Sequence, residues 1–228
     1  MNLGEEWPVR YAGARRLASL VALVLVNLIP LAGVLLFDWD VAALMILYWS
    51  ENLVIGFYTL VKLVVKSPIG GWFSGLFFLI HYGGFCGVHG LFIVTMLLDE
   101  KFSAFPDDPW PLWLVFPQIL FNVIGHVISL APPEWLWSFA ALFISHGVSF
   151  VANFLLADER DRLSKSQIMN APYGRVIVLH LAVLFGGFAV LALGQPMFML
   201  VILVLLKLGV DIAFHLREHG KTAERGGE

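Results

Sequence analysis

Charged side chains are scarce in this chain of 228 residues, because Asp, Glu, Lys and Arg make up 14% of it while apolar residues make up 59%. The mean hydropathy is +0.83. A soluble domain carries a larger share of charge to cover its surface, so the composition excludes that class and indicates a polytopic membrane protein. The net charge of −3 excludes a basic surface of the kind that binds nucleic acid.

Cysteine is nearly absent as well. The single thiol, Cys86, excludes a disulfide within the chain, so cysteine usage does not reveal the redox compartment. A separate soluble module is also excluded, because apolar segments consume almost the whole length. The sequence predicts a cytoplasmic tail over 1–16, a transmembrane helical domain over 17–216 and a polar tail over 217–228.

Hydropathy predicts an all-α bundle of about seven transmembrane helices, with six as the alternative. Tryptophans stand at most of the segment boundaries, where an amphipathic indole prefers the headgroup layer. Turn residues such as Pro132 and Pro133 separate the segments. The predicted segments are 17–37, 41–65, 72–98, 112–131, 135–156, 174–193 and 196–216.

The distribution of basic residues between the two sides of the membrane does not fit seven crossings. Arg10, Arg15 and Arg16 precede the first segment and predict a cytoplasmic N-terminus. Seven crossings would then leave the basic loop over 160–175 and the basic C-terminal tail outside. If one segment within 112–156 did not cross, both basic regions would be cytoplasmic, so six crossings stay open.

All seven histidines lie inside an apolar segment or within one turn of one. An imidazole in hydrocarbon costs several kcal/mol unless it finds a hydrogen-bond partner, a counter-charge or a metal. The pattern therefore predicts a polar site within the bundle. Its candidate members are His81, His89, His126, His146, His180 and His215, with the carboxylates Glu51 and Asp211.

The last two segments suggest a metal site. A two-residue linker folds them as antiparallel neighbours, which places His180 opposite residue 209 and near Asp211, while His215 shares a helix face with Asp211. Imidazoles and a carboxylate are ligands of zinc and other divalent metals. His89 completes the set with seven crossings, and His81 replaces it with six.

An ion pair is the alternative explanation of the same residues. Lys207 lies one turn before Asp211, and Arg175 can reach that carboxylate from the preceding segment. A neutral pair of this kind would stabilise the bundle without any chemistry.

Two further residues are candidates for proton transfer. Glu51 lies in the middle of the second segment, where a carboxylate needs a histidine, a metal or Lys207 as partner, or else a proton and a neighbouring hydroxyl. With a partner it can act as proton carrier or general base. His146, with Ser149 and Asn153 at one-turn spacings, is the second candidate catalytic residue.

Several of these motifs resemble a prokaryotic integral-membrane family called domain of unknown function 6498. The resemblance covers most of residues 45–219. It implies that the protein is located in the cytoplasmic membrane of a prokaryote, and it names no reaction. A looser analogy links the histidines, aspartate and serine to the seven-helix ceramidase and progestin-receptor-like hydrolases, although their motif order is not reproduced. The motifs are Tyr-Trp-Ser-Glu-Asn at 48–52, His-Tyr-Gly-Gly-Phe at 81–85 with His89, residues 145–150, Ala-Pro-Tyr-Gly-Arg at 171–175 with His180, and residues 207–219.

Three functions follow as expectations. A zinc-like site of His89 or His81 with His180, Asp211 and His215 would hydrolyse a lipid-like or other small substrate, assisted by Glu51 and His146. A small transporter would use the buried Glu, Asp and His groups as an ion or proton pathway. A haem b protein would need two facing imidazoles, for which His81 and His146 are the candidates. The lipid bilayer is the expected partner in every case, and the sequence leaves the oligomeric state open.

Overall fold

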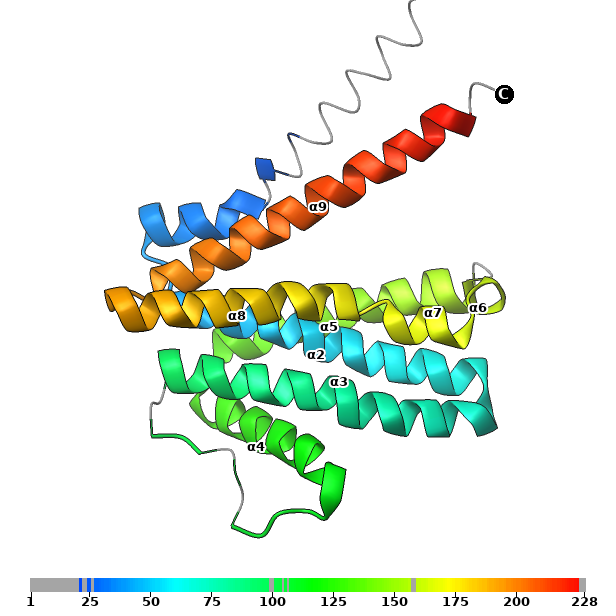
Figure 1. Cartoon of the computed structure of the whole chain (residues 1–228), viewed down its shortest axis with the longest axis horizontal. Helices are drawn as coiled ribbons and strands as arrows, with labels where there is room; N and C mark the ends of the chain where they lie inside the picture. The colour runs from blue at the N-terminus through cyan, green and yellow to red at the C-terminus, as the bar shows by residue number, and fades with distance from the viewer. Residues whose placement is uncertain are drawn as a thin grey trace, which may run out of the picture.

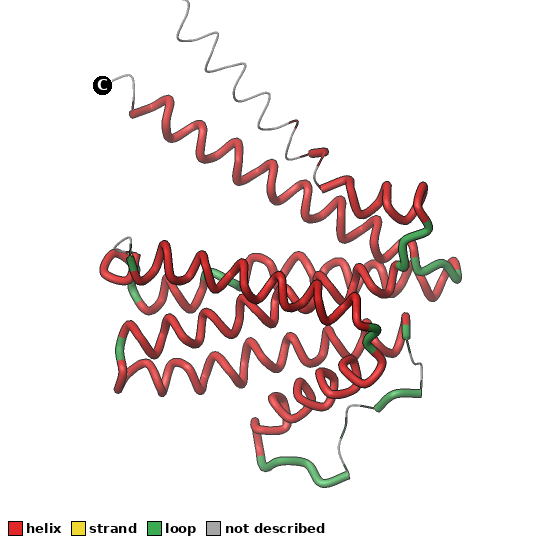
Figure 2. Tube along the Cα trace, turned by 180° about the vertical axis from the view of Figure 1, so that it is seen from behind, coloured by secondary structure: helices red, strands yellow, loops and turns green. Residues whose placement is uncertain are grey.

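The computed structural model describes residues 21, 24, 25, 27–98, 101–103, 105, 107–156 and 159–225, with side chains as far as Ala213 except that of residue 69. Every regular element in these residues is a helix (Figure 2). The predicted all-α class is therefore confirmed. Within the described part of the chain, five helices are long and apolar enough to cross a membrane. A shorter apolar helix, Asn27–Phe37, precedes them.

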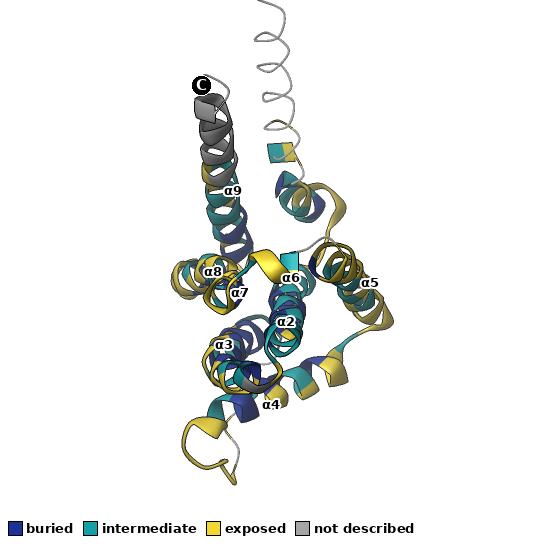
Figure 3. Ribbon diagram, turned by 90° about the vertical axis from the view of Figure 1, so that its right-hand side faces the viewer, coloured by how far each residue is buried: buried dark blue, intermediate teal, exposed yellow. Residues whose placement is uncertain are grey.

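Helix α2 (Val41–Lys66) lies at the centre of the bundle, as the end-on view shows (Figure 3). The side chain of Asp40 caps its first turn by accepting a hydrogen bond of 2.9 Å from the backbone N–H of Ala42. Helix α3 (Pro68–Leu97) returns antiparallel to α2 after a single linking residue, Ser67. The fully buried indole of Trp49 on α2 donates to the carbonyl of Cys86 at 2.8 Å, which fixes the contact between the two helices.

The next long helix runs in the same direction as α3. After a long loop, the short helix η1 (Leu112–Leu114) leads into α4 (Val115–Leu130), which packs on α3 (Figures 1 and 2). Phe116 lies against Gly84, in the middle of α3, and Leu120 lies against Gly87. Helix α4 therefore starts beside the middle of α3 and ends level with the end of α3. It does not traverse the whole bundle.

The loop before α4 is held by Gln118. Its side-chain oxygen accepts from the backbone N–H of Trp110 at 2.7 Å, and its nitrogen donates to the carbonyl of Asp108 at 3.0 Å. Gln118 is itself buried, so both bonds are shielded from competing water. The segment that enters α4 is thus fastened to the helix it leads into.

Helix α5 (Pro133–Ser149) and the π-helix η2 (Phe150–Leu155) run beside α2. Tyr58 on α2 donates to the carbonyl of Phe143 at 3.0 Å and marks this contact. Most of the α5 surface faces outward (Figure 3). In a bilayer, lipid would cover this surface.

Two short helices, α6 (Glu159–Arg162) and α7 (Lys165–Asn170), lead into α8 (Tyr173–Leu193). Gly194 ends α8 in the left-handed conformation, with φ of 67°, and α9 (Met197–Arg225) folds back along α8. At Gly186 the two helices approach so closely that a Cβ atom there would lie 2.7 Å from Cα of Met199. This crossing sets the register of the hairpin.

The two ends of the bundle differ in charge. The end where Ser67 joins α2 to α3, here called the Ser67 end, also holds α6 and α7 (Figure 1). The opposite end, where Pro132 joins α4 to α5, is called the Pro132 end. Among described residues, basic side chains outnumber acidic ones near the Ser67 end, where Lys62, Lys66, Arg160, Arg162 and Lys165 lie with Glu159 and Asp161. Acidic side chains dominate near the Pro132 end, namely Asp38, Asp40 and Glu134.

Candidate functional site

Four charged side chains line one cavity inside the bundle, here called the four-charge pocket. Glu51 comes from α2, Arg175 from α8, and Lys207 and Asp211 from α9. The cavity has a volume of about 530 Å³. Its other polar lining groups are Asn27, Tyr48 and Asn52.

The four-charge pocket extends from mid-depth of the bundle toward the Ser67 end. At about 1.5 Å per helical residue, Glu51 and Lys207 each lie about 15 Å from the Pro132 end of their helices, Asp211 about 21 Å and Arg175 about 27 Å. The hydrocarbon core of a bilayer is about 30 Å thick, so its midplane lies about 15 Å from either face. Carboxylates and cations at this depth are costly and are mostly functional.

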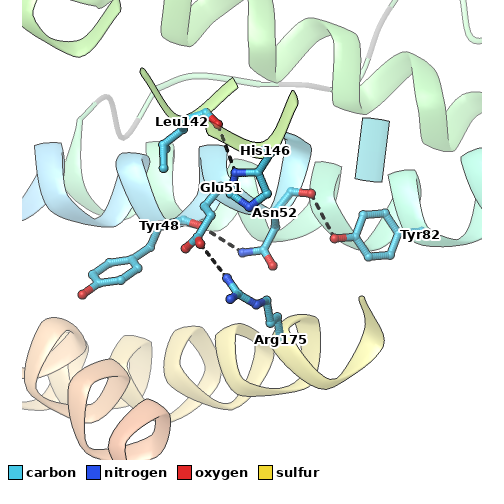
Figure 4. Close-up of polar contacts among 7 residues, drawn as sticks. All are labelled: Tyr48, Glu51, Asn52, Tyr82, Leu142, His146 and Arg175. Carbon is cyan, nitrogen blue, oxygen red and sulfur yellow. Dashed lines mark hydrogen bonds and ion pairs between the residues drawn. The ribbon is translucent and has the colours of Figure 1, made fainter. Parts of the chain in front are cut away.

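One ion pair closes across this pocket. A guanidinium nitrogen of Arg175 donates to a carboxylate oxygen of Glu51 at 2.6 Å, which joins α8 to α2 (Figure 4). The bond uses a single nitrogen–oxygen contact, and 54% of the Arg175 side chain stays exposed, against 22% for Glu51. Most of the guanidinium donors therefore remain available to the cavity.

The other charges of the four-charge pocket are only partly compensated. The ammonium of Lys207 lies 5.1 Å from the ring centre of Tyr48, and no described carboxylate is within ion-pair distance of it. Asp211 accepts a hydrogen bond of 3.1 Å from the side-chain amide of Asn27. The side-chain oxygen of Asn52 is buried without a hydrogen-bond partner. Buried charges and polar atoms without full hydrogen bonding are stabilised when water, a proton or a polar solute enters the cavity.

The helix break before α8 opens into the same cavity. Helix α7 ends at Asn170, and α8 begins at Tyr173, although Lys165–Leu193 together form one candidate membrane span. Ala171 at the break and Gly174 just after it line the four-charge pocket. Interrupted helices in membranes are tolerated where the freed backbone lines a cavity or is buried in protein.

Three histidines line a second cavity, here called the histidine pocket, between α3, α8 and the start of α4. His89 and His180 are directly hydrogen bonded, with 2.7 Å between Nε2 and Nδ1. His81 Nδ1 lies 2.8 Å from the hydroxyl of Tyr173. The ring of Phe85 contacts all three imidazoles, with centroid distances of 5.2, 6.1 and 6.4 Å to His81, His89 and His180.

The structure brings together only part of the predicted metal-ligand set. His89 and His180 meet, but Asp211 lies in the four-charge pocket, away from them. No group of three His, Cys, Asp or Glu side chains among the described residues is placed to hold a metal ion. The side chain of His215 lies outside the described residues.

The register of the last hairpin explains why Asp211 and His180 separate. The Gly186–Met199 contact centres the hairpin near residue 193, so Asp211 lies opposite residue 174 and next to Arg175. His180 is six residues further along α8, or about 9 Å away in depth. The predicted hairpin centre near residue 194 or 195 had placed them at similar depth.

His146 lies on a different side of α2 from the four-charge pocket. It comes from α5 and approaches α2 from the side opposite Arg175 (Figure 4). Its Nδ1 lies 3.0 Å from the carbonyl of Leu142, one turn earlier in its own helix. The two predicted catalytic residues, Glu51 and His146, are therefore each bonded to other groups. His81 faces α8 instead of His146, so the candidate haem pair does not meet.

The sequence predicted the buried charges but not their pairing. Arg175 was expected to reach Asp211, and Glu51 to take a histidine, a metal or Lys207; instead Arg175 pairs with Glu51. Asn27 was not predicted at all. A polar amide in the middle of an apolar segment, ten residues before its end, was the signal that could have found it.

The family model described as "Family of unknown function (DUF6498)" matches residues 10–228. The chain belongs to this family. The resemblance predicted from the motifs is thereby confirmed. No curated protein and no solved structure matches the chain.

Proposed function

We propose that the chain is a small membrane transporter in which Glu51 and Asp211 carry protons through the middle of the bundle. One observation carries this proposal: four charges share a cavity that reaches mid-depth at Glu51 and Lys207, and a single ion pair forms between them. Charges kept in hydrocarbon without full compensation are expensive, and proton relays are one of their common uses. The interrupted α7–α8 helix at the edge of the cavity is a further feature of transporters.

Proton transfer follows from the groups in the four-charge pocket. Protonation of Glu51 releases Arg175, whose guanidinium is always charged and then has to find another acceptor. Asp211, level with Arg175, is that acceptor. A proton arriving at one carboxylate is thereby coupled to movement of the cation toward the other.

The charge distribution supports an orientation with six crossings. Because α4 begins beside the middle of α3 and ends at the Pro132 end, it enters and leaves from one side. The basic Ser67 end is then cytoplasmic by the positive-inside tendency, together with the end of α9. This proposal retains a cytoplasmic N-terminus in a prokaryotic cytoplasmic membrane, and it resolves the conflict that seven crossings create.

Glu51→Gln combined with Asp211→Asn is expected to lower proton flux at least tenfold, because neither amide can carry a proton at neutral pH. The measurement is the valinomycin-driven acidification of proteoliposomes that contain a pH-sensitive dye. Glu134→Gln is the matched control, since this carboxylate lies in the first turn of α5 outside the four-charge pocket, and its flux should equal that of wild type. Wild-type flux no faster than that of protein-free liposomes would refute the proposal.

A metal-dependent hydrolase is the second candidate, favoured by the direct contact of His89 with His180. Two imidazoles on neighbouring helices are a starting point for zinc ligation. His89 Nε2 and His180 Nδ1 are 2.7 Å apart in their hydrogen bond. Two zinc–nitrogen bonds of about 2.05 Å at a tetrahedral angle need nitrogens about 3.3 Å apart, so the two imidazoles would have to separate by about 0.6 Å. A third ligand would have to come from His81 or His215. A lipid-like substrate would enter from the bilayer.

Elemental analysis of the purified protein decides between the two candidates. If zinc is held there, His89→Ala with His180→Ala should reduce a content near one per chain to background, since both ligands are lost. His126→Ala is the control, because His126 stacks on Phe102 at a centroid distance of 4.0 Å and is no part of the histidine pocket. Equal zinc in both variants, or none in wild type, would exclude the metal site.

A further inference from the structure

We propose that the histidine pocket binds a membrane-soluble quinone, independently of the proton pathway. The pocket has a volume of about 580 Å³ and lies on the outer surface of the bundle, because its lining residues Phe77, Trp113 and His180 are exposed. Apart from the imidazoles its lining is apolar and aromatic. Such a cavity admits a flat apolar molecule from the bilayer and offers it a small number of placed polar groups.

The hydrogen bonds determine which imidazoles donate into the cavity. The hydroxyl of Tyr173 has His81 Nδ1 as its only acceptor among the described residues, so it donates to that nitrogen, and the proton of His81 lies on Nε2. His89 is 2% exposed and its Nδ1 has no partner, so a proton there would be an orphaned donor. His89 therefore donates from Nε2 to His180 Nδ1, which leaves the proton of His180 on its Nε2.

His81 and His180 thus present two N–H donors at different depths of one pocket. The bond to Tyr173 places His81 at the depth of residue 173, and His180 follows seven residues later, or about 10 Å along α8. Donors at two depths of one pocket suit a flat molecule that carries an acceptor on each of two opposite sides, as the two carbonyl oxygens of a quinone ring do.

The aromatic lining suits the ring that lies between these carbonyls. Phe85 contacts all three imidazoles. Trp113 and Phe116, from the start of α4, stand on the other wall and stack on each other at a centroid distance of 6.2 Å. Offset stacking on such rings stabilises a flat conjugated molecule. The start of α4 beside the middle of α3 therefore has a role as one wall of the site.

Titration of the purified protein with a benzoquinone that carries a ten-carbon tail tests this proposal through tryptophan fluorescence. We expect saturable quenching, about half of which disappears in Trp113→Phe. His81→Leu and His180→Leu should each weaken binding about tenfold, the loss of one hydrogen bond of about 1.4 kcal/mol. His180→Gln, which keeps a donor, should recover part of the affinity, and His126→Leu should bind like wild type.

Several outcomes would overturn the proposal. Non-saturable quenching means that the quinone only dissolves in the detergent or bilayer. Equal affinity in the Leu variants means that the imidazoles do not hold the carbonyls. If phospholipids with brominated acyl chains quench Trp113 and displace the quinone with no effect of the histidine variants, the cavity is a site for an acyl chain.

Discussion

Arg175→Met is expected to lower the free energy of unfolding by about 1–3 kcal/mol at pH 8, because it leaves the carboxylate of Glu51 unpaired at mid-depth. The lower end of this range applies if water screens the ion pair, because about half of the Arg175 side chain is exposed. Thermal unfolding of the purified protein in detergent at pH 8 measures the effect.

The double variant Glu51→Gln with Arg175→Met distinguishes the ion pair from simple packing. Removing both charges leaves no unpaired ion, so stability should return to within about 1 kcal/mol of wild type while proton flux stays lost. Lys62→Met is the control, because the Lys62–Glu159 pair at 3.4 Å lies near the Ser67 end and should contribute less than about 1 kcal/mol. A double variant as unstable as Arg175→Met alone would show that the guanidinium acts through its packing.

Gly186→Ala should destabilise the protein by about 1–3 kcal/mol, and Gly186→Leu should prevent folding. The added Cβ would lie 2.7 Å from Cα of Met199, so the α8 and α9 backbones would have to separate. A separation here also carries Lys207 and Asp211 away from Arg175. Thermal unfolding measures the first variant, and the yield of monodisperse protein measures the second.

Gly125→Ala is the matched control for this contact. It lies within α4, and a Cβ atom there would meet nothing within 4 Å. Alanine is the better helix former by about 1 kcal/mol, so this variant should be neutral or slightly more stable. If Gly186→Ala were equally harmless, the α8–α9 crossing would not determine the register of the hairpin.

The sequence was most informative where burial and periodicity decide the structure. Apolar segments of about 20 residues can satisfy their backbone groups in a bilayer only as helices, so their class and approximate bounds followed directly. The helix boundary at Pro132 and Pro133 depends on local chain geometry, and the sequence predicted it too. The placement of Glu51, Lys207 and Asp211 at membrane depth followed from counting residues.

The starting depth of α4 was not predictable from hydropathy. Residues 112–130 are long and apolar enough to cross a membrane, as the sequence predicted. The start of α4 beside Gly84 depends on the long loop that returns along α3 and on the small residues that let α4 approach. Hydropathy contains neither the direction nor the starting depth of a helix.

The sequence by itself determined that this protein is a helical membrane protein of its family, and which polar side chains had to find partners inside it. Only the tertiary structure decided the partners: Arg175 with Glu51, Asn27 with Asp211 and His89 with His180. The reason is geometric. A shift of one residue in a hairpin turns each later side chain by about 100° and moves it by about 1.5 Å, so contacts between helices depend on a packing register that no single segment encodes.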